Sequence, residues 1–367
     1  MRVLIVPDKF KGTLTAQAAA EAIASGWRQA RPNDSLELLP MSDGGDGFGE
    51  VMSGLLGGRR ETSKTCNAAH EASEAAWYHV ASESTAIVES AGVIGLAMLP
   101  PGKFHPFELD TLGLGKTVNE ILSRFEVKDL IVGIGGSATN DGGFGMARAL
   151  GFSFLDNQKN EINEWTQLPS LDRIVPPSRR LTCKVTIATD VQNMLLGAEG
   201  ATRIYGPQKG LKPEDFPKAE GALQRLADTV KRDLQVDAAN EPGTGAAGGL
   251  GYGLRVFLNG TFESGFHLFA RLSKLEERIA RAGLVITAEG AIDTSTAMGK
   301  GTGAVAGMAS ALKKDCIAFA GAVGSQTAFR AVHSITPGLA SESASKKMPA
   351  KYLTLLARNV ASELKRD

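Results

Sequence analysis

Short apolar runs that end in glycine-rich polar loops recur along the chain and limit the folds that it can adopt. The runs at residues 3–6, 129–133 and 284–287 are predicted to be buried strands, and each is followed by a loop and a helical pattern. Repeated β-loop-α units are typical of α/β proteins with parallel sheets. A chain of 367 residues exceeds one typical domain, so we expect an α/β protein of two domains.

The charge balance argues against broad classes of partner. The 40 basic and 40 acidic side chains cancel, so no positive field favours nucleic acid or an anionic membrane. Neither a signal peptide nor an apolar stretch long enough to cross a bilayer is recognisable. Cys66, Cys183 and Cys316 lie far apart, are odd in number and have no metal-ligand spacing, which indicates reduced thiols. We expect a cytoplasmic protein without nucleic-acid or membrane partners.

Five polar loops at predicted strand ends combine glycine with a carboxylate or a lysine. Ligands bind beyond the carboxyl ends of strands in such sheets, where backbone amides favour anions. Lysines and amides can neutralise phosphate oxygens, and carboxylates can hold Mg²⁺ or accept a proton from an attacking hydroxyl. Any one loop could be a simple turn, but the five together predict phosphoryl transfer. The loops are residues 8–12, residues 42–47, residues 133–143, Asp190 with residues 206–210, and residues 289–300.

A dinucleotide site is the main competing interpretation. The segment from Gly133 to Ala138 matches G-x-G-x-x-A after a predicted strand, and Asp156 follows about 20 residues later. A dinucleotide-binding helix would, however, already run through Gly142 and Gly143, each of which costs about 1 kcal/mol there relative to alanine. The loop is long for that motif, and a dehydrogenase remains an alternative.

A second glycine run, at residues 243–253, has two interpretations that the sequence leaves open. Its amides could cradle a phosphate, because glycine lets a backbone approach a ligand closely. The same glycines and alanines could equally allow a helix to pack tightly against its neighbours.

Taken in order, the loops resemble those of the bacterial class I glycerate kinase family over nearly the whole chain. Residues 8–16 match D-x-F-K-G-(S/T)-L-(S/T)-A, residues 42–47 match (A/S)-D-G-G-(E/D)-G, and residues 133–143 match G-I-G-G-S-A-T-N-D-G-G. D-V-x-N-x-L-L-G is found at residues 190–197, and G-P-Q-K-G at residues 206–210. The last family motif, T-G-E-G-x-x-D-x-Q-T-x-x-G-K, aligns with residues 287–300. There the chain departs from the family, with Ala288 in place of glycine and Ser295 in place of glutamine.

The resemblance implies a fold and an activity. One domain would be flavodoxin-like, with a parallel sheet built from both chain ends (residues 1–75 and 275–367). Residues 76–274 would form a central α/β domain with a mixed sheet. The implied enzyme is a kinase that uses ATP and Mg²⁺ to phosphorylate D-glycerate, usually to 2-phosphoglycerate and less often to 3-phosphoglycerate, as a monomer or homodimer. The departures at Ala288 and Ser295 also suggest a non-catalytic regulator that binds a small acid.

Site residues follow from the matched motifs together with their chemistry. Mg²⁺ is expected at Asp190 and Asp293. The expected catalytic residues are Asp190, Glu289, Asp293 and Lys300; the expected substrate-binding residues are Asp8, Lys11, Asp43 and Asp46; and the expected nucleotide- and phosphate-binding residues are Gly135, Gly136, Ser137, Ala138, Thr139, Asn140, Asp141 and Lys209.

Overall fold

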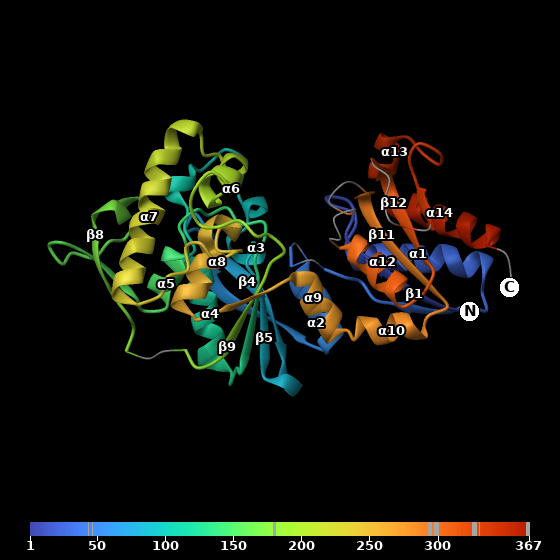
Figure 1. Ribbon diagram of the computed structural model, residues 1–367, viewed down its shortest axis with the longest axis horizontal. Coiled ribbons are helices and arrows are strands. Elements are labelled where there is room, and N and C mark those ends of the chain that lie inside the picture. The colour runs from blue at the N-terminus through green and yellow to red at the C-terminus, as the bar shows by residue number, and fades with distance from the viewer. Residues whose placement is uncertain are drawn as a thin grey trace. The chain divides into compact units, whose positions relative to one another are not determined.

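The computed structural model divides the chain into two compact units (Figure 1). The split unit comprises Met1–Asp43 and Phe266–Asp367, and the central unit comprises Gly44–Gly265. The structure describes residues 1–42, 44–45, 47–178, 181–292, 296, 301–324, 329 and 331–364. No helix within these described residues is both long and apolar enough to cross a membrane.

The split unit contains a five-stranded sheet in the order β13-β12-β11-β1-β2, and all of its neighbouring strands are parallel. Figure 1 shows the blue strand β1 beside the orange strand β11, although they come from opposite ends of the chain. This confirms the expected parallel sheet built from both ends. The strands are β1 (Arg2–Pro7), β2 (Ser35–Leu38), β11 (Leu284–Ile292), β12 (Cys316–Val323) and β13 (Ala331–Ser334).

Helix α1 follows β1 and shows why this part of the chain is helical. Thr15 accepts a hydrogen bond from the Ala18 amide at the helix start, and Ala19, Ile23 and Trp27 are buried at helical spacing. At Gly26 a Cβ would lie 2.0 Å from Thr354 O, so glycine allows α1 and α14 to pack closely. The helices of this unit are α1 (Ala16–Ala30), α9 (Gly265–Leu272), α10 (Leu275–Arg281), α12 (Thr302–Ala311), α13 (Glu342–Lys347) and α14 (Pro349–Glu363).

The central unit contains a six-stranded sheet in the order β10-β9-β6-β5-β4-β3. Strands β5, β6, β9 and β10 are parallel, whereas β3 and β4 pair in antiparallel fashion, so the sheet is mixed as expected. A separate antiparallel pair joins β7 (Ser153–Asp156) to β8 (Leu171–Val175). The sheet strands are β3 (Arg59–Cys66), β4 (Ala72–Val80), β5 (Thr85–Glu89), β6 (Asp129–Gly133), β9 (Lys184–Ala188) and β10 (Thr261–Glu263).

Helices cover this sheet and enclose one core, in which Trp77, Phe144, Phe154 and Trp165 are almost completely buried. The helices are α2 (Phe48–Leu56), α3 (Ala91–Ile94), α4 (Leu112–Arg124), α5 (Phe144–Ala149), α6 (Ala201–Lys209), α7 (Phe216–Asp233) and α8 (Ala246–Phe257). Short 3₁₀ turns occupy Ala81–Glu83, Leu96–Met98, Pro106–Glu108, Trp165–Ser170 and Pro213–Asp215.

The compact units divide the chain at different positions from the sequence-based boundaries. The first boundary was expected between residues 75 and 76, which lies inside β4, whereas the central unit already begins at Gly44. β3 pairs with β4 from Arg59 opposite His79 to Cys66 opposite Ala72, and this pairing places β3 in the central sheet. The second boundary was expected after residue 274, and the compact units divide after Gly265.

Candidate functional site

The glycine loop at residues 133–143 begins where β6 ends, in the middle of the central sheet. Three of its amides are bound to neighbouring backbone: Ile134 N donates to Ala188 O, Ala138 N to Ile94 O, and Gly142 N to Gly248 O. The amides of Gly135, Gly136 and Ser137, in contrast, donate to no residue in the described part of the chain. Backbone amides in a fixed loop that lack internal acceptors can bind an anion.

Gly45 lies close to the glycine loop. At Gly135 a Cβ would lie 3.2 Å from the Cα of Gly45, so glycine permits the two backbones to approach this closely. The two aspartates predicted as substrate ligands in the loop at residues 42–47, Asp43 and Asp46, lie outside the described residues.

Lys209, predicted to bind phosphate, is buried behind the glycine loop. Its Nζ donates to Ser137 Oγ at 3.0 Å and to Thr139 O at 2.6 Å. Burial lowers the pKa of the Lys209 ammonium to about 7, and the negative charge of Asp141 opposes this shift. The lysine is thus hydrogen-bonded to the loop from inside the protein.

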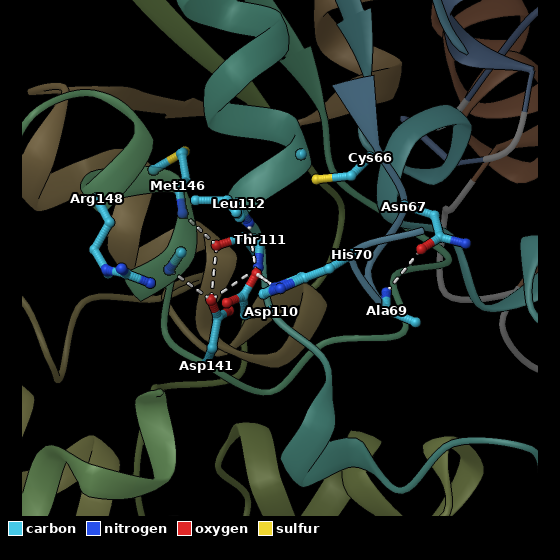
Figure 2. A network of polar contacts seen from close by, with 12 residues as sticks. Cys66, Asn67, Ala69, His70, Asp110, Thr111, Leu112, Asp141, Met146 and Arg148 are labelled. Carbon is cyan, nitrogen blue, oxygen red and sulfur yellow. Dashed lines mark hydrogen bonds and ion pairs between the residues drawn. The ribbon is translucent and has the colours of Figure 1, made fainter. Parts of the chain in front are cut away.

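Asp141 is also turned inward (Figure 2). Its Oδ2 accepts hydrogen bonds from Thr111 N at 3.0 Å, Thr111 Oγ1 at 2.7 Å and Gly145 N at 2.9 Å. Burial raises the pKa of Asp141 to about 6, with a further contribution from the charge of Asp110. The Asp141 side chain therefore joins the glycine loop to the first turns of α4 and α5.

Figure 2 also shows His70 beside Asp110, and the His70 Nε2 lies 2.9 Å from the Asp110 Oδ1. Asp110 is buried and additionally accepts a hydrogen bond from Leu112 N at 2.8 Å. This pair anchors the segment that enters α4, next to the loop residues described above.

Asp190 follows β9 at the same edge of the sheet as the glycine loop, because β6 and β9 are parallel neighbours. Its Oδ1 accepts a hydrogen bond from Ser264 Oγ, and Ser264 follows the next parallel strand, β10. Asp190 is partly exposed. The sheet topology therefore brings Asp190 and Ser137, two of the predicted site residues, to one edge.

In the split unit, Asp8 directly follows β1, and Glu289 lies in β11 just past Ala288, where the pairing of β11 with β1 ends. Asp8 N donates to Ala288 O at 2.8 Å, and a Cβ on Gly301 would lie 3.6 Å from Asp8 Oδ2. Glu289 Oε1 accepts hydrogen bonds from the hydroxyls of Thr296 and Thr302, the latter at the start of α12. Two of the predicted acidic residues are thus gathered beside the beginning of one helix.

Of the other predicted site residues in the split unit, the structure describes Lys11. Lys11 is exposed in the loop after β1, and a Cβ on Gly290 would lie 3.5 Å from its amide nitrogen. Asp293 and Lys300 lie outside the described residues. Among the residues that are described, no three His, Cys, Asp or Glu side chains form a cluster that could hold a metal ion.

Glu89 is a residue that the sequence analysis missed. It ends β5, and its carboxylate accepts hydrogen bonds from Gly47 N at 3.0 Å and from Gly49 N at 3.1 Å. It therefore holds the start of α2 and, through Gly47, the end of the loop at residues 42–47. A carboxylate at the end of a predicted strand is the signal that could have identified it.

The glycine run at residues 243–253 is needed for close packing. A Cβ on Gly248 would lie 1.9 Å from Thr139 O, and one on Gly253 would lie 2.6 Å from the Cα of Gly143. Both neighbours are backbone atoms of the glycine loop, which cannot move aside as a flexible side chain can. This observation favours the packing interpretation that the sequence left open.

Comparison with known proteins connects this geometry to one family. The model of the glycerate kinase family matches residues 3–365. The chain is 36% identical to the glycerate 2-kinase of Escherichia coli strain K12 over 88% of its own length and 86% of that protein. It is 34% identical to the glycerate kinase of Bacillus subtilis strain 168 over 100% of its own length and 98% of that protein.

A solved structure gives the same result. A Salmonella typhimurium LT2 protein with the assignment glycerate kinase 2 superposes with a TM-score of 0.86 at 35% identity, covering 99% of this chain and 97% of that one. Motifs, fold and both kinds of comparison agree, and the chain belongs to the glycerate kinase family.

Proposed function

We propose that the protein transfers the γ-phosphoryl group of ATP to the 2-hydroxyl of D-glycerate, which yields 2-phosphoglycerate and ADP. Family membership supports the reaction class, and similarity to the glycerate 2-kinase of Escherichia coli supports the 2-position. The observation that carries the proposal is the edge of the central sheet at the end of β6. There the amides of Gly135, Gly136 and Ser137, which have no acceptor among the described residues, share one edge with Asp190.

The glycine loop is the proposed phosphate site. Its amides would donate to the phosphate oxygens of ATP, and they are already fixed before the nucleotide binds, which lowers the cost of orienting them. The hydrogen bonds of Ala138 and Gly142 to the neighbouring backbone provide this rigidity.

Asp190 fits Mg²⁺ as a partly exposed carboxylate next to the proposed phosphates, because Mg²⁺ prefers one or two carboxylates together with phosphate oxygens. Asp190, with Asp293, would hold the ion. When bound, Mg²⁺ would neutralise charge on the β- and γ-phosphates.

Glycerate presents a carboxylate and two hydroxyls. We assign Lys11, an exposed cation, to the carboxylate, and Asp8, with Asp43 and Asp46, to the hydroxyls. In the reaction the 2-hydroxyl oxygen forms a bond to the γ-phosphorus, the bond from that phosphorus to the ADP oxygen breaks, and the hydroxyl proton passes to a carboxylate. Asp190 and Glu289 are the proposed catalytic carboxylates that the structure describes, and Asp293 and Lys300 complete the proposed set.

The dehydrogenase alternative has less support. In a dinucleotide motif the glycines open a helix, and the pyrophosphate lies at the start of that helix. Here α5 begins only at Phe144, and Gly136, Gly142 and Gly143 all have positive φ. The G-x-G-x-x-A segment therefore does not open a helix but belongs to a long loop that continues to Gly143. A non-catalytic regulator would bind glycerate without releasing ADP, and a coupled ADP assay separates that outcome from a kinase.

The substitution Asp190→Asn tests the catalytic assignment. The amide oxygen can still accept from Ser264, so we expect the fold to remain. ATP should still bind to the unchanged loop amides, more weakly for lack of one Mg²⁺ ligand, while kcat falls by roughly three powers of ten or more. Steady-state ADP release and calorimetric ATP binding measure the two effects. The matched control is Asp172→Asn, an exposed carboxylate on β8. Near-normal turnover of Asp190→Asn would exclude the role.

Phosphorus NMR of the product tests the position of transfer. A single 2-phosphoglycerate resonance is expected, because glycerate bound in one orientation presents only one of its hydroxyls to the γ-phosphorus. A 3-phosphoglycerate resonance would keep the kinase but reject the 2-position.

A further inference from the structure

Lys209 places an ammonium group in the interior of the central unit. It is the last residue of α6, and Gly210, with φ of 108°, ends the helix in the left-handed conformation. Only 6% of Lys209 is exposed. A buried charge is costly compared with an apolar side chain of similar length, unless polar groups compensate it. A lysine here therefore requires partners, and its partners are in the glycine loop.

These partners hold one short stretch of backbone. Lys209 Nζ donates to Ser137 Oγ and Thr139 O, and Ser137 Oγ itself donates to Ala247 O at 2.9 Å. One ammonium thus connects residues 137 and 139 of the loop to α6, while the Ser137 hydroxyl connects the loop to α8. The loop is therefore held at Ser137 and Thr139 by groups in the interior of the central unit.

Gly248 leaves the space that the ammonium occupies. A Cβ there would lie 2.8 Å from Lys209 Nζ and 1.9 Å from Thr139 O, and Gly248 has φ of 71°. The glycine run, for which the sequence left a phosphate cradle and close packing both open, makes room at Gly248 for the lysine and the glycine loop. Lys209, Ser137, Thr139 and Gly248 are called the clasp below.

We propose that Lys209 is a positioning residue of the nucleotide site: through the clasp it fixes the turn that presents the amides of Gly135, Gly136 and Ser137, and it does not contact phosphate itself. Amides neutralise a phosphate best when their dipoles are oriented before it arrives. The proposal rests on the proposed function, because it assumes that this loop binds ATP. It replaces direct phosphate binding, the role expected for Lys209 from the sequence.

Kinetics of Lys209→Met provide the first test. Methionine keeps the length and removes the donors, so we expect KM for ATP to rise about 10- to 100-fold, with KM for glycerate unchanged. The midpoint of thermal unfolding should be kept or raised, because methionine carries no buried charge. Lys212→Met, at an exposed lysine nearby in the chain, is the matched control. A normal KM for ATP, or a loss of stability alone, would reject the positioning role.

Coupling to Ser137 provides a second kinetic result. If Lys209 acts through the Ser137 hydroxyl, the variant Lys209→Met/Ser137→Ala should have nearly the same KM for ATP as Lys209→Met alone. Additive increases in KM would mean that the two side chains act independently and would contradict the clasp.

Amine labelling distinguishes positioning from direct phosphate contact without relying on turnover. The wild-type protein is treated with acetic anhydride, with and without saturating ATP, and each lysine is quantified by mass spectrometry. We expect Lys209 to react far more slowly than Lys212 in both samples, because it is already buried without nucleotide. Rapid labelling of Lys209 that ATP suppresses would show a phosphate contact and overturn the proposal.

The two proposals fail in different ways. If the wild type releases no ADP with glycerate, the proposed function fails, whereas slow labelling of Lys209 would still support the buried clasp. If ADP release is normal and Lys209 is rapidly labelled, the kinase assignment stands and the positioning role falls.

Discussion

His70 is about half exposed, yet its ring pairs with the buried carboxylate of Asp110. The hydrogen bond to Asp110 raises the pKa of His70, while burial and the charges of Lys116 and Arg148 act in the opposite direction. A pKa that is raised in the folded state means that protonated His70 stabilises the fold. This contribution is complete below the unfolded value of 6.5 and is lost as pH rises through the folded pKa.

The substitution His70→Asn tests this residue. His70 has φ of 61°, which asparagine tolerates better than most residues, so the change removes the ring without adding backbone strain. We expect it to lower the free energy of unfolding by about 0.5 kcal/mol more at about pH 5 than at about pH 9, a small difference because solvent screens the exposed ring. Urea unfolding at both pH values measures it. A penalty independent of pH would show that the ion pair contributes nothing.

The start of helix α2 depends on a side chain from strand β5. Gly47 precedes the helix with φ of 86° and has no side chain to cap it, so Glu89 at the end of β5 accepts from the amides of Gly47 and Gly49 instead. A carboxylate at a helix N-terminus both satisfies amides and complements the helix dipole. The contact also holds the loop at residues 42–47, which contains proposed substrate ligands.

We expect Glu89→Gln to destabilise the protein by about 1–2 kcal/mol, because a neutral amide offers one acceptor where the carboxylate offered two. KM for glycerate should rise as well, since the loop at residues 42–47 loses an anchor. Denaturant unfolding and steady-state kinetics check the two effects. Glu50→Gln, an exposed glutamate in the first turn of the same helix, is the control and should change neither quantity appreciably. Equal behaviour of the two variants would contradict the anchoring role.

The two compact units differ in how the chain forms them. The central unit is one continuous segment with its own core, from Trp77 on β4 to Tyr252 on α8. The sheet of the split unit needs β1 and β2 from the amino-terminal segment and β11, β12 and β13 from the carboxyl-terminal one. Neither of these segments contains the whole sheet or its core.

A fragment of residues 44–265 should therefore fold alone, with cooperative thermal unfolding and a near-UV circular dichroism signal from its buried tryptophans Trp77 and Trp165. Fragments 1–43 and 266–367 should each be largely unfolded and should gain structure only when mixed. Circular dichroism of the separate and mixed fragments is the measurement. A disordered 44–265 fragment would show that the central unit depends on the rest of the chain.

Features that depend on a local pattern of residues could be predicted from the sequence. Apolar runs predicted β1, β6 and β11 because a buried parallel strand is apolar on both faces, and the polar loops at strand ends predicted the edge at which Asp190 and Ser137 both lie. β3 was missed, because Arg59–Cys66 lacks an apolar pattern and is a strand by virtue of its pairing with β4. Edge strands of this kind are specified by their partner more than by their own residues.

Which polar residues face inward depends on tertiary packing and could not be predicted from the sequence. Lys209 and Asp141 carry the residue types of a phosphate site, but α6, α8 and the start of α4 enclose them, so that their charges hold the glycine loop. The same packing determined that Gly248 leaves room for the Lys209 ammonium. Burial depends on segments distant in the chain, and no local pattern of residues contains that information.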